Sequence, residues 1–500
     1  MNLSKSRYTN GVTCGKKLWL SCYKPTVAEE LGNEDVLDNG TKVGELARGL
    51  FGNCKLVSFD TNFKNMIDET NKLLEDKPNI ICEASFSYDG NFCSVDILIN
   101  DVDGVEIYEV KSSTEISNIY IDDITYQTWV LKKLGFNVKK SYLVYINKDY
   151  EKNGDFLVNS FFKIEDVTSI INTLNVEEEV SKLKDILNKK EEPNIDLSDS
   201  CHSPYDCQFF KYCTEKLPTP NVFDIGWRLG FNKKLEMYKR GHITFEDVLN
   251  KEKINSKAKA QILLALNNIE PIINKEKINE LLNNLTYPLY FLDFESYQSC
   301  IPTIDGTRPY QQICFQYSLH ILDEDNNLTH KEYLSDDYDG NPMYGLCKRL
   351  CEDIPMNSCV LVYNKSFEGS RLKEMAELFP EFREHLLNIK DNIIDLMTPF
   401  ANQDYYLKEM GGRWSIKVVL PSLFPDDPSL DYHNLNDVHK GDEASAAYLS
   451  LPNLDKKEQD KLRYNMLKYC ELDTYALVKI HEKLKEVTNN KCYVKKLTIC

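Results

Sequence analysis

The sequence lacks any apolar run long enough to cross a membrane, and no apolar secretory segment follows Met1. We therefore expect a cytoplasmic protein with no membrane partner. The chain also lacks an excess of basic residues, since its formal net charge is −18. This balance argues against a sequence-independent nucleic-acid coat protein. It does not argue against a nuclease, because acids that hold metal ions add to the negative charge and local basic patches can still bind a phosphate backbone.

The composition is that of a folded globular protein. Apolar residues make up 42% and aromatic residues 11% of the 500 residues. A chain of this length is expected to form two or three domains. The 16 cysteines are scattered, and in a reducing cytoplasm a cluster of them indicates a metal site rather than disulfides.

Two turn sequences divide residues 80–114 into expected strands of alternating apolar and polar residues. Asp96 lies on the second strand, and Glu109 and Lys111 lie on the third, two apart and therefore on one face. Gln127 follows on an expected helix. An acid followed on the neighbouring strand by Glu-X-Lys is the PD-(D/E)XK pattern, in which two carboxylates hold Mg²⁺ and the ammonium stabilises negative charge. The alternative is a solvent-facing, salt-bridged hairpin.

Three regularly spaced cysteines follow a charged linker, in the segment CHSPYDCQFFKYC. They are Cys201, Cys207 and Cys213, and their spacing is not that of a C-x-x-C zinc ribbon. A fourth ligand is needed to close a tetrahedral or cubane site. Cys14 is the candidate for this position, and His202 could compete for it. We favour an iron–sulfur cluster over zinc, and the alternative to both is a set of buried thiols.

These features resemble the RecB-type nucleases with an iron–sulfur staple, which include the CRISPR-adaptation nucleases and the AddB-type helicase–nuclease subunits. The motifs that carry the resemblance are Cys14 in CGKKLWL, Asp96, EVKSS, Gln127 and the cysteine triplet. The resemblance implies that four cysteines tie the two chain ends of the nuclease domain around a [4Fe-4S] cluster. It also implies that Asp96, Glu109 and Lys111 are catalytic and that Gln127 assists them.

One position departs from these families, which usually have a metal-binding histidine on the first helix. The matching stretch, GTKVGELAR, has Gly44 and Glu45 and no histidine. Either Glu45 substitutes for the histidine or the metal site of this half is weakened.

A second pair of acids lies in YFLDFESY, residues 290–297, which reads as a buried strand. Asp293 and Glu295 are two apart and project to the same side, with Phe294 turned into the core. Burying two like charges on a central strand is costly. A bound divalent cation would compensate for that cost. The alternative is an edge strand with two solvated acids.

Further acids follow in an order that resembles the DEDD exonucleases of the ribonuclease-H-like fold. Asp293-X-Glu295 resembles the first motif, and NKSFE resembles the second, with Glu368 where most members have Asp. Tyr469-X-X-X-Asp473, on one face of a long expected helix, resembles the third motif in its tyrosine form. The resemblance implies that the four acids clamp two Mg²⁺ or Mn²⁺ ions and that Tyr469 orients the attacking water at a 3′ end. The alternative for the third motif is an ordinary helix face.

We therefore expect a multidomain α/β protein. A RecB-like PD-(D/E)XK domain of restriction-endonuclease-like fold is expected over residues 1–215, a helical connector over 216–283, and a ribonuclease-H-like exonuclease domain over 284–500. GGRWSIKVVLPSLFP and the two halves together closely resemble a bacterial family that carries a domain of unknown function and this two-nuclease layout.

The expected function is a metal-dependent nuclease that acts on DNA rather than RNA. Its expected cofactors are Mg²⁺ or Mn²⁺ and a [4Fe-4S] cluster, with zinc as the alternative to the cluster. The alternative function is a nucleic-acid-binding repair or defence scaffold with one or both nuclease modules inactive. Arg413 and Lys417 are candidates for phosphate contacts and Trp414 for base stacking, or all three pack the sheet.

Overall fold

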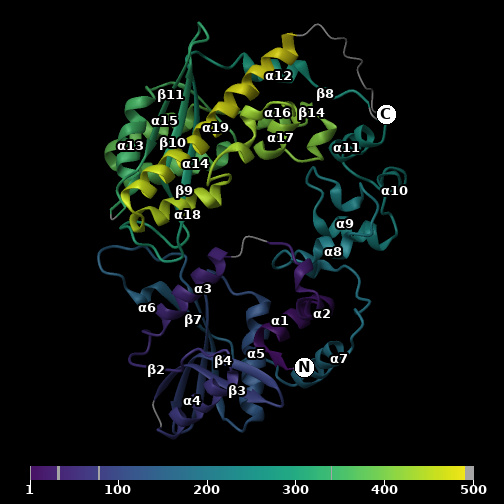
Figure 1. Ribbon diagram of the computed structural model, residues 1–500, viewed down its shortest axis with the longest axis vertical. Helices are drawn as coiled ribbons and strands as arrows, with labels where there is room; N and C mark the ends of the chain where they lie inside the picture. Colours follow the sequence, from purple (N-terminus) through teal and green to yellow (C-terminus); the bar gives the residue numbers. More distant parts are fainter. Residues whose placement is uncertain (1, 31–33, 77–78, 268, 339, 490–500) are drawn as a thin grey trace. The chain divides into compact units, whose positions relative to one another are not determined.

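The computed structural model describes residues 2–30, 34–76, 79–267, 269–338 and 340–489. The chain forms two compact units of mixed α/β structure (Figure 1). The first unit consists of residues 1–217 and Ser299–Gln311, and the second consists of residues 218–298 and 312–500. Most of the expected connector therefore groups with the second unit, and Ser299–Gln311 group with the first.

A seven-stranded sheet forms the centre of the first unit, in the order β2-β3-β4-β5-β6-β7, with β1 paired to β4. The pairs β3–β4, β4–β5 and β6–β7 are antiparallel, whereas β5–β6 is parallel. The strands are β1 (Leu3–Ser4), β2 (Lys55–Leu56), β3 (Ile80–Tyr88), β4 (Asn91–Asp101), β5 (Gly104–Lys111), β6 (Val138–Ile146) and β7 (Phe162–Asp166).

Helices cover both faces of this sheet. The helix α5 packs through Ile124 and Trp129 against the face that carries Ile107. Val43 of α3 packs on the other face, in a core with Tyr108. Since Glu109 and Lys111 alternate with Tyr108, they project toward α5. The helices are α1 (Lys5–Thr13), α2 (Gly15–Tyr23), α3 (Glu34–Ala47), α4 (Phe63–Glu75), α5 (Asn118–Lys133), α6 (Val158–Phe161), α7 (Val176–Asn188) and α8 (Phe210–Thr214).

The second unit is built on a five-stranded sheet in the order β11-β10-β9-β12-β13. The strand β9 is central, antiparallel to β10 and parallel to β12. The strands of this unit are β8 (Ile272–Ile273), β9 (Leu289–Gln298), β10 (Gln312–Leu322), β11 (Leu328–Leu334), β12 (Cys359–Val362), β13 (Ile393–Asp395) and β14 (Tyr405–Tyr406).

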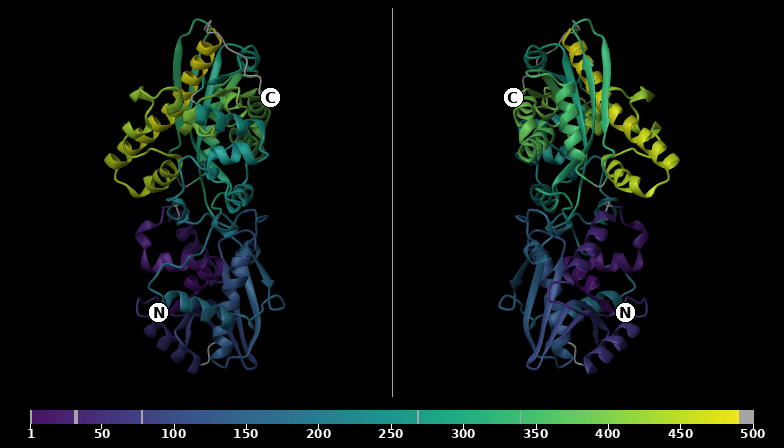
Figure 2. Two further views of the ribbon diagram at one scale, coloured as in Figure 1. Left: turned by 90° about the vertical axis from the view of Figure 1, so that its right-hand side faces the viewer. Right: turned by 90° about the vertical axis from the view of Figure 1, so that its left-hand side faces the viewer.

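The long helix α19 (Lys456–Asn489) and the helix α13 (Pro342–Asp353) lie on opposite faces of this sheet (Figure 2). On β10, Gln316 donates to the carbonyl of Met466 in α19 at 3.0 Å, and the next residue, Tyr317, donates to Asp353 in α13 at 2.6 Å. The other helices of the unit are α9 (Phe231–Lys239), α10 (Phe245–Lys251), α11 (Ser256–Asn267), α12 (Lys275–Leu282), α14 (Lys365–Leu378), α15 (Arg383–Asp391), α16 (Thr398–Ala401), α17 (Ile416–Leu423) and α18 (Gly441–Ser450).

The expected multidomain α/β organisation is confirmed at this level. The segment YFLDFESY lies in a central strand, not in an edge strand. Within the part of the chain that the structure describes, no helix combines the length and apolar character needed to cross a membrane.

Candidate active sites

The central strand β9 presents Asp293 and Glu295 to α19. Phe294, between them, is buried on the other face, where it pairs with Tyr317. Cys470 of α19 meets the two acids, and its Sγ donates to Asp293 Oδ2 at 3.8 Å. One ligand atom from each of Asp293, Glu295 and Cys470 lies within 4.8 Å of the others. The alternation of side chains along β9 therefore gathers two carboxylates and a thiol at one point.

The third expected motif, on α19, reaches the same site. Asp473 is buried and accepts a hydrogen bond from Tyr432 Oη at 2.6 Å. Burial raises the pKa of Asp473 to about 6, while hydrogen bonds from Tyr432 and Tyr469 and the charge of Lys417 oppose the rise. Tyr469 and Asp473 therefore lie side by side at the carboxylates of β9, as their spacing on one helix face requires.

Glu368 enters the site from the first turn of α14. Its side chain is 2% exposed, and its Oε2 atom has no hydrogen-bond partner. Burial raises the pKa of Glu368 to about 8. The charge of Glu368 in turn raises the pKa of Asp293. A buried carboxylate oxygen with no donor is expensive unless another group compensates it.

The acids of this site repel one another. Burial, followed by the charge of Asp473, raises the pKa of both Asp293 and Glu295 well above the usual range. Lys417 opposes this rise at Glu295. Buried carboxylates in such a set are favourable when they share a divalent cation. The unpartnered Glu368 oxygen and the spacing of the ligand atoms both fit such a cation.

A cavity of about 1000 Å³ is lined by Tyr432 and Lys417, two neighbours of these carboxylates. Its lining includes Lys417, Phe424, Tyr432, His433 and Lys440. Tyr432 lines the cavity and donates to Asp473, so this side chain lies between the cavity and that carboxylate. The lining is mixed, since four acids, Asp426, Asp427, Asp431 and Glu443, stand beside the two lysines and the apolar side chains.

Of the residues expected to contact phosphates or bases, Lys417 lines this cavity and Trp414 does not. Lys417 is exposed and lines the cavity. Trp414 instead stacks on Trp227, with ring centroids 5.1 Å apart, and is partly buried against the core of this unit. Trp414 is therefore a packing residue, which was one of the two alternatives for it.

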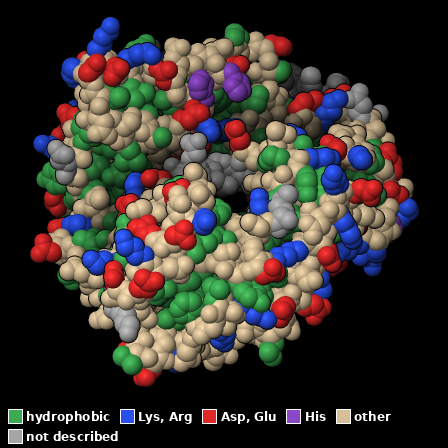
Figure 3. Space-filling view, turned by 60° about the horizontal axis from the view of Figure 1, so that its bottom comes forward, with side chains coloured by type: hydrophobic (Ala, Val, Ile, Leu, Met, Phe, Trp, Pro, Cys, Tyr) green, Lys and Arg blue, Asp and Glu red, His purple; other side chains and the backbone are tan. Residues whose placement is uncertain are grey.

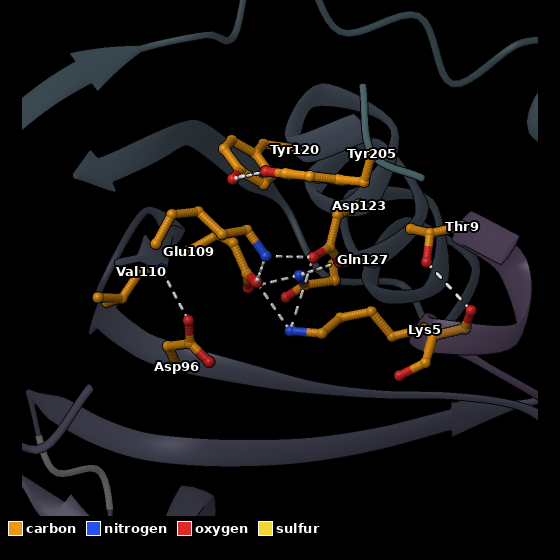
Figure 4. Close-up of polar contacts among 11 residues, drawn as sticks. Lys5, Thr9, Asp96, Glu109, Val110, Tyr120, Asp123, Gln127 and Tyr205 are labelled. Atoms are coloured by element: carbon orange, nitrogen blue, oxygen red, sulfur yellow. Dashed lines mark hydrogen bonds and ion pairs between the residues drawn. The ribbon is translucent and has the colours of Figure 1, made fainter. Parts of the chain in front are cut away.

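In the first unit, Glu109 is surrounded by hydrogen-bond donors (Figure 4). Its Oε1 accepts from Lys111 Nζ at 2.6 Å and from Lys5 Nζ at 2.8 Å, and its Oε2 accepts from Gln127 Nε2 at 2.6 Å. Asp123, one turn before Gln127 on α5, accepts from Lys111 at 2.6 Å and from Gln127 at 3.0 Å. Three of the expected residues therefore meet, and Lys5 and Asp123 join them.

Asp96 lies opposite Glu109 on β4, where its Oδ2 accepts from the backbone N–H of Val110 at 2.6 Å. Burial and the charge of Glu109 raise the pKa of Asp96 to about 8. Burial opposes the ionisation of Glu109, but Lys111 and Lys5 hold its pKa well below the usual range. The two acids thus differ because only Glu109 lies in contact with the ammonium groups.

A divalent cation does not fit the first site in this arrangement. Both oxygens of Glu109 accept hydrogen bonds, and the Lys5 ammonium that binds Oε1 also lies 3.9 Å from Asp123 Oδ2. Glu45, the candidate to replace the missing histidine, is exposed on α3. A cation at Glu109 would require Lys5 to move away.

Two tyrosines cover the Lys111 side of this site. Tyr120 and Tyr205 share a hydrogen bond between their hydroxyl groups at 2.7 Å, and Figure 4 shows both rings beside the charged cluster. The ammonium of Lys111 lies 5.3 Å from the centre of the Tyr120 ring. Tyr205 is 59% exposed, so an aromatic surface is open to solvent at the site.

The four expected cysteine ligands lie near one another in the first unit. Burial raises the pKa of Cys213 to about 11, and the charges of Cys207, Cys201 and Cys14 add to the rise. The Cys207 N–H donates to the carbonyl of Cys201 at 2.9 Å. His202, the expected competitor, pairs with Asp206.

Within the described residues, the four sulfurs do not gather into a compact group. Among the residues that the structure describes, only the Asp293 group brings three metal-ligating atoms within 4.8 Å of one another, so no three of these sulfurs lie that close. Tetrahedral zinc with bonds of about 2.3 Å would hold all its sulfurs within about 4 Å of one another.

Several residues at these sites had a weak sequence signal or none. Asp123 precedes Gln127 by four residues and Cys470 precedes Asp473 by three, so helix periodicity could have placed both. Lys5 is 104 residues from Glu109 in the chain. No local pattern links it to the site, because its position depends on how α1 packs on α5.

Residues 290–415 match a family described as Domain of unknown function (DUF2779). The chain is 34% identical over 216 residues to the uncharacterized protein MG366 of Mycoplasma genitalium, covering 40% of this chain and 32% of that protein. It is 30% identical over 217 residues to the MG366 homolog of Mycoplasma pneumoniae, with the same two coverages of 40% and 32%. The chain thus spans about a third of the length of these relatives. The expected similarity to a bacterial domain of unknown function is confirmed for the DUF2779 stretch that carries Asp293, Glu295 and Glu368.

Proposed function

We propose that this chain is a metal-dependent nuclease whose second unit is a DEDD-type exonuclease of ribonuclease-H-like fold. The observation that carries the proposal is the set of buried carboxylates between β9, α14 and α19, including the Glu368 oxygen that has no hydrogen-bond partner. Such a set is unfavourable in an ordinary core and useful in a site that binds divalent cations.

The residues of the second unit would have separate roles in phosphodiester hydrolysis. Cations held by the four acids would supply an activated water and stabilise the oxygen that leaves. Tyr469, beside Asp473, is placed to orient the water. The cavity next to Tyr432 takes the terminal nucleotide, and Lys417 binds one of its phosphates. We propose DNA, attacked at its 3′ end, as the substrate.

Two functions are compatible with the first unit. A RecB-like PD-(D/E)XK nuclease would use Asp96, Glu109 and Lys111, with Gln127 assisting. The contact of Lys5 with Glu109 favours the second candidate function, a nucleic-acid-binding module that does not cleave. In that case Lys5 and Lys111 bind backbone phosphates, and the four-cysteine site, with its proposed [4Fe-4S] cluster, is structural.

The test is cleavage of end-labelled single-stranded DNA and RNA with Mn²⁺. We expect stepwise loss of 3′ nucleotides from DNA that falls at least about 100-fold in Asp293→Asn, because a direct cation ligand is lost. Asp353→Asn is the matched control, since Asp353 is a buried acid on the opposite face of the same sheet. Unchanged cleavage by Asp293→Asn would refute the assignment.

Lys111→Ala, compared with Lys140→Ala on the neighbouring strand, tests the first unit in the same assay. Residual cutting that Lys111→Ala removes would identify a second nuclease site. Binding of DNA that weakens in Lys111→Ala, with cleavage unchanged, would identify the binding module instead.

A further inference from the structure

Cys470 lies within the carboxylate site of the second unit. Its thiol is fully buried, and its Sγ is 3.8 Å from Asp293 Oδ2. Two ligands of one cation, at metal–oxygen distances of about 2.1 Å and metal–sulfur distances of about 2.3 Å, are separated by about 3 to 4.4 Å. The spacing of Cys470, Asp293 and Glu295, all within 4.8 Å, is close to that range.

The helix α19 aims Cys470 and Asp473 at the same point, because residues three apart share a helix face. Glu368 independently indicates that a ligand belongs there, since its Oε2 atom is buried without a partner and its charge acts on Asp293. A thiol and two carboxylates therefore meet at one place, and Glu368 lies close enough for its charge to act on Asp293.

The simpler role for a buried cysteine is that of a small apolar residue. The surroundings of Cys470 do not fit that role. Its Sγ atom lies 3.8 Å from Asp293 Oδ2 and within 4.8 Å of a Glu295 oxygen, so its neighbours are acids. A cation among those acids would neutralise them and favour the thiolate, as metal coordination does for cysteines in general.

On the basis of the carboxylate site proposed above, we infer that Cys470 is a metal ligand of the second unit and that it makes the site prefer a borderline-soft divalent cation over Mg²⁺. Thiolate ligands favour cations such as Zn²⁺ and Co²⁺, whereas an all-oxygen site suits Mg²⁺. Replacing the sulfur by oxygen removes that preference.

The test is a Co²⁺ titration of the full chain, with its four-cysteine site loaded, followed by near-ultraviolet absorption. Co²⁺ bound to a thiolate gives a charge-transfer band, which reports the bond without any cleavage assay. We expect the band in the wild type and in Cys347→Ser, a matched control because Cys347 is fully buried on α13. We expect no band in Cys470→Ser, and Co²⁺ affinity lower by roughly tenfold or more.

Two further variants guard against misfolding and separate this inference from the proposed function. Cys470→Ala must lose the same band, and Asp293→Asn must weaken it while keeping the thiol. A band that survives in Cys470→Ser would overturn the role of Cys470. If the wild type shows exonuclease activity but no such band, the role of Cys470 is overturned and the proposed nuclease function is not. If the wild type neither binds Co²⁺ nor cleaves DNA, both the role of Cys470 and the proposed nuclease function are overturned.

Discussion

The acids of the second unit hold protons that solvated acids would have lost. Burial raises the pKa of Glu368 to about 8 and that of Asp473 to about 6. Between the ordinary carboxyl pKa of about 4 and these values, the cation-free folded chain therefore binds more protons than the unfolded chain. Folding stability then falls as pH rises through this window.

We expect the melting temperature of the cation-free protein to fall between pH 6 and pH 8, by the equivalent of a few kcal/mol at most. Mn²⁺ should raise the melting temperature more at pH 8 than at pH 6, because it replaces protons on the same oxygens. Thermal melts at both pH values measure this. The difference should shrink in Asp293→Asn, and equal stabilisation by Mn²⁺ at both pH values would contradict the prediction.

Single residues were predictable where a local period fixed their direction. The period of two along β9 placed Asp293 and Glu295 together, and the helix period placed Tyr469 with Asp473. The role of Trp414 was not predictable, because its partner Trp227 lies far away in the chain. The local sequence period predicts the direction of a side chain, whereas its contacts depend on how distant segments pack.

Among the elements, α14 depends on an acid from a neighbouring strand. Asp395, at the end of β13, accepts hydrogen bonds from the N–H groups of Asn364 and Lys365, both at 3.0 Å. These are orphan donors at the start of α14, whose first turn carries Glu368. Asp395 therefore caps the helix and holds Glu368 in place.

Asp395→Ala should lower the free energy of unfolding by about 1–2 kcal/mol, as the loss of an N-cap does. Exonuclease activity should fall as well, because the first turn of α14 loosens around Glu368. Urea denaturation and the cleavage assay measure the two effects. Asp391→Ala, at an exposed acid near the end of α15, is the control. Full activity in Asp395→Ala would show that Glu368 needs no such support.

The elements with strong periodicity were predictable from sequence. The long helix expected to carry Tyr469 and Asp473 is α19, and YFLDFESY lies within β9. The strand β1 was not predictable, because it spans two residues and exists through its pairing with β4. That pairing matters for the site, since α1 and Lys5 follow β1 directly.

On the scale of the whole molecule, the cysteine site joins segments far apart in the first unit. Cys14 precedes α2, whereas Cys213 lies in α8. Trp19 and Phe209 pack beside these cysteines in a small core of their own. A cluster bound there closes a long loop of chain, which stabilises the fold mainly by restricting the unfolded state.

Anaerobic purification should yield a brown protein whose iron and visible absorption are lost in Cys213→Ser. The melting temperature of that variant should fall by several degrees, because the loop is no longer closed. Cys22→Ser, at a half-buried cysteine of α2, is the control. A colourless wild type with one zinc per chain would contradict the cluster.

Charge on the surface limits how the whole protein can hold nucleic acid. On the face drawn in Figure 3, acidic and basic side chains are interspersed and form no continuous basic field. With a net charge of −18, the proposed binding of DNA would rely on a few lysines at the sites. Affinity for DNA should then depend only weakly on salt, because few counterions are released.

The insertion of Ser299–Gln311 into the first unit means that neither unit is a continuous piece of the gene. The polypeptide passes from one unit to the other after Leu217, after Gln298 and again after Gln311. A ribosome reaches Ser299–Gln311 only after it has translated β9. The last segment of the first unit is therefore synthesised after part of the second unit. Recombination at a single point therefore cannot exchange either unit for another.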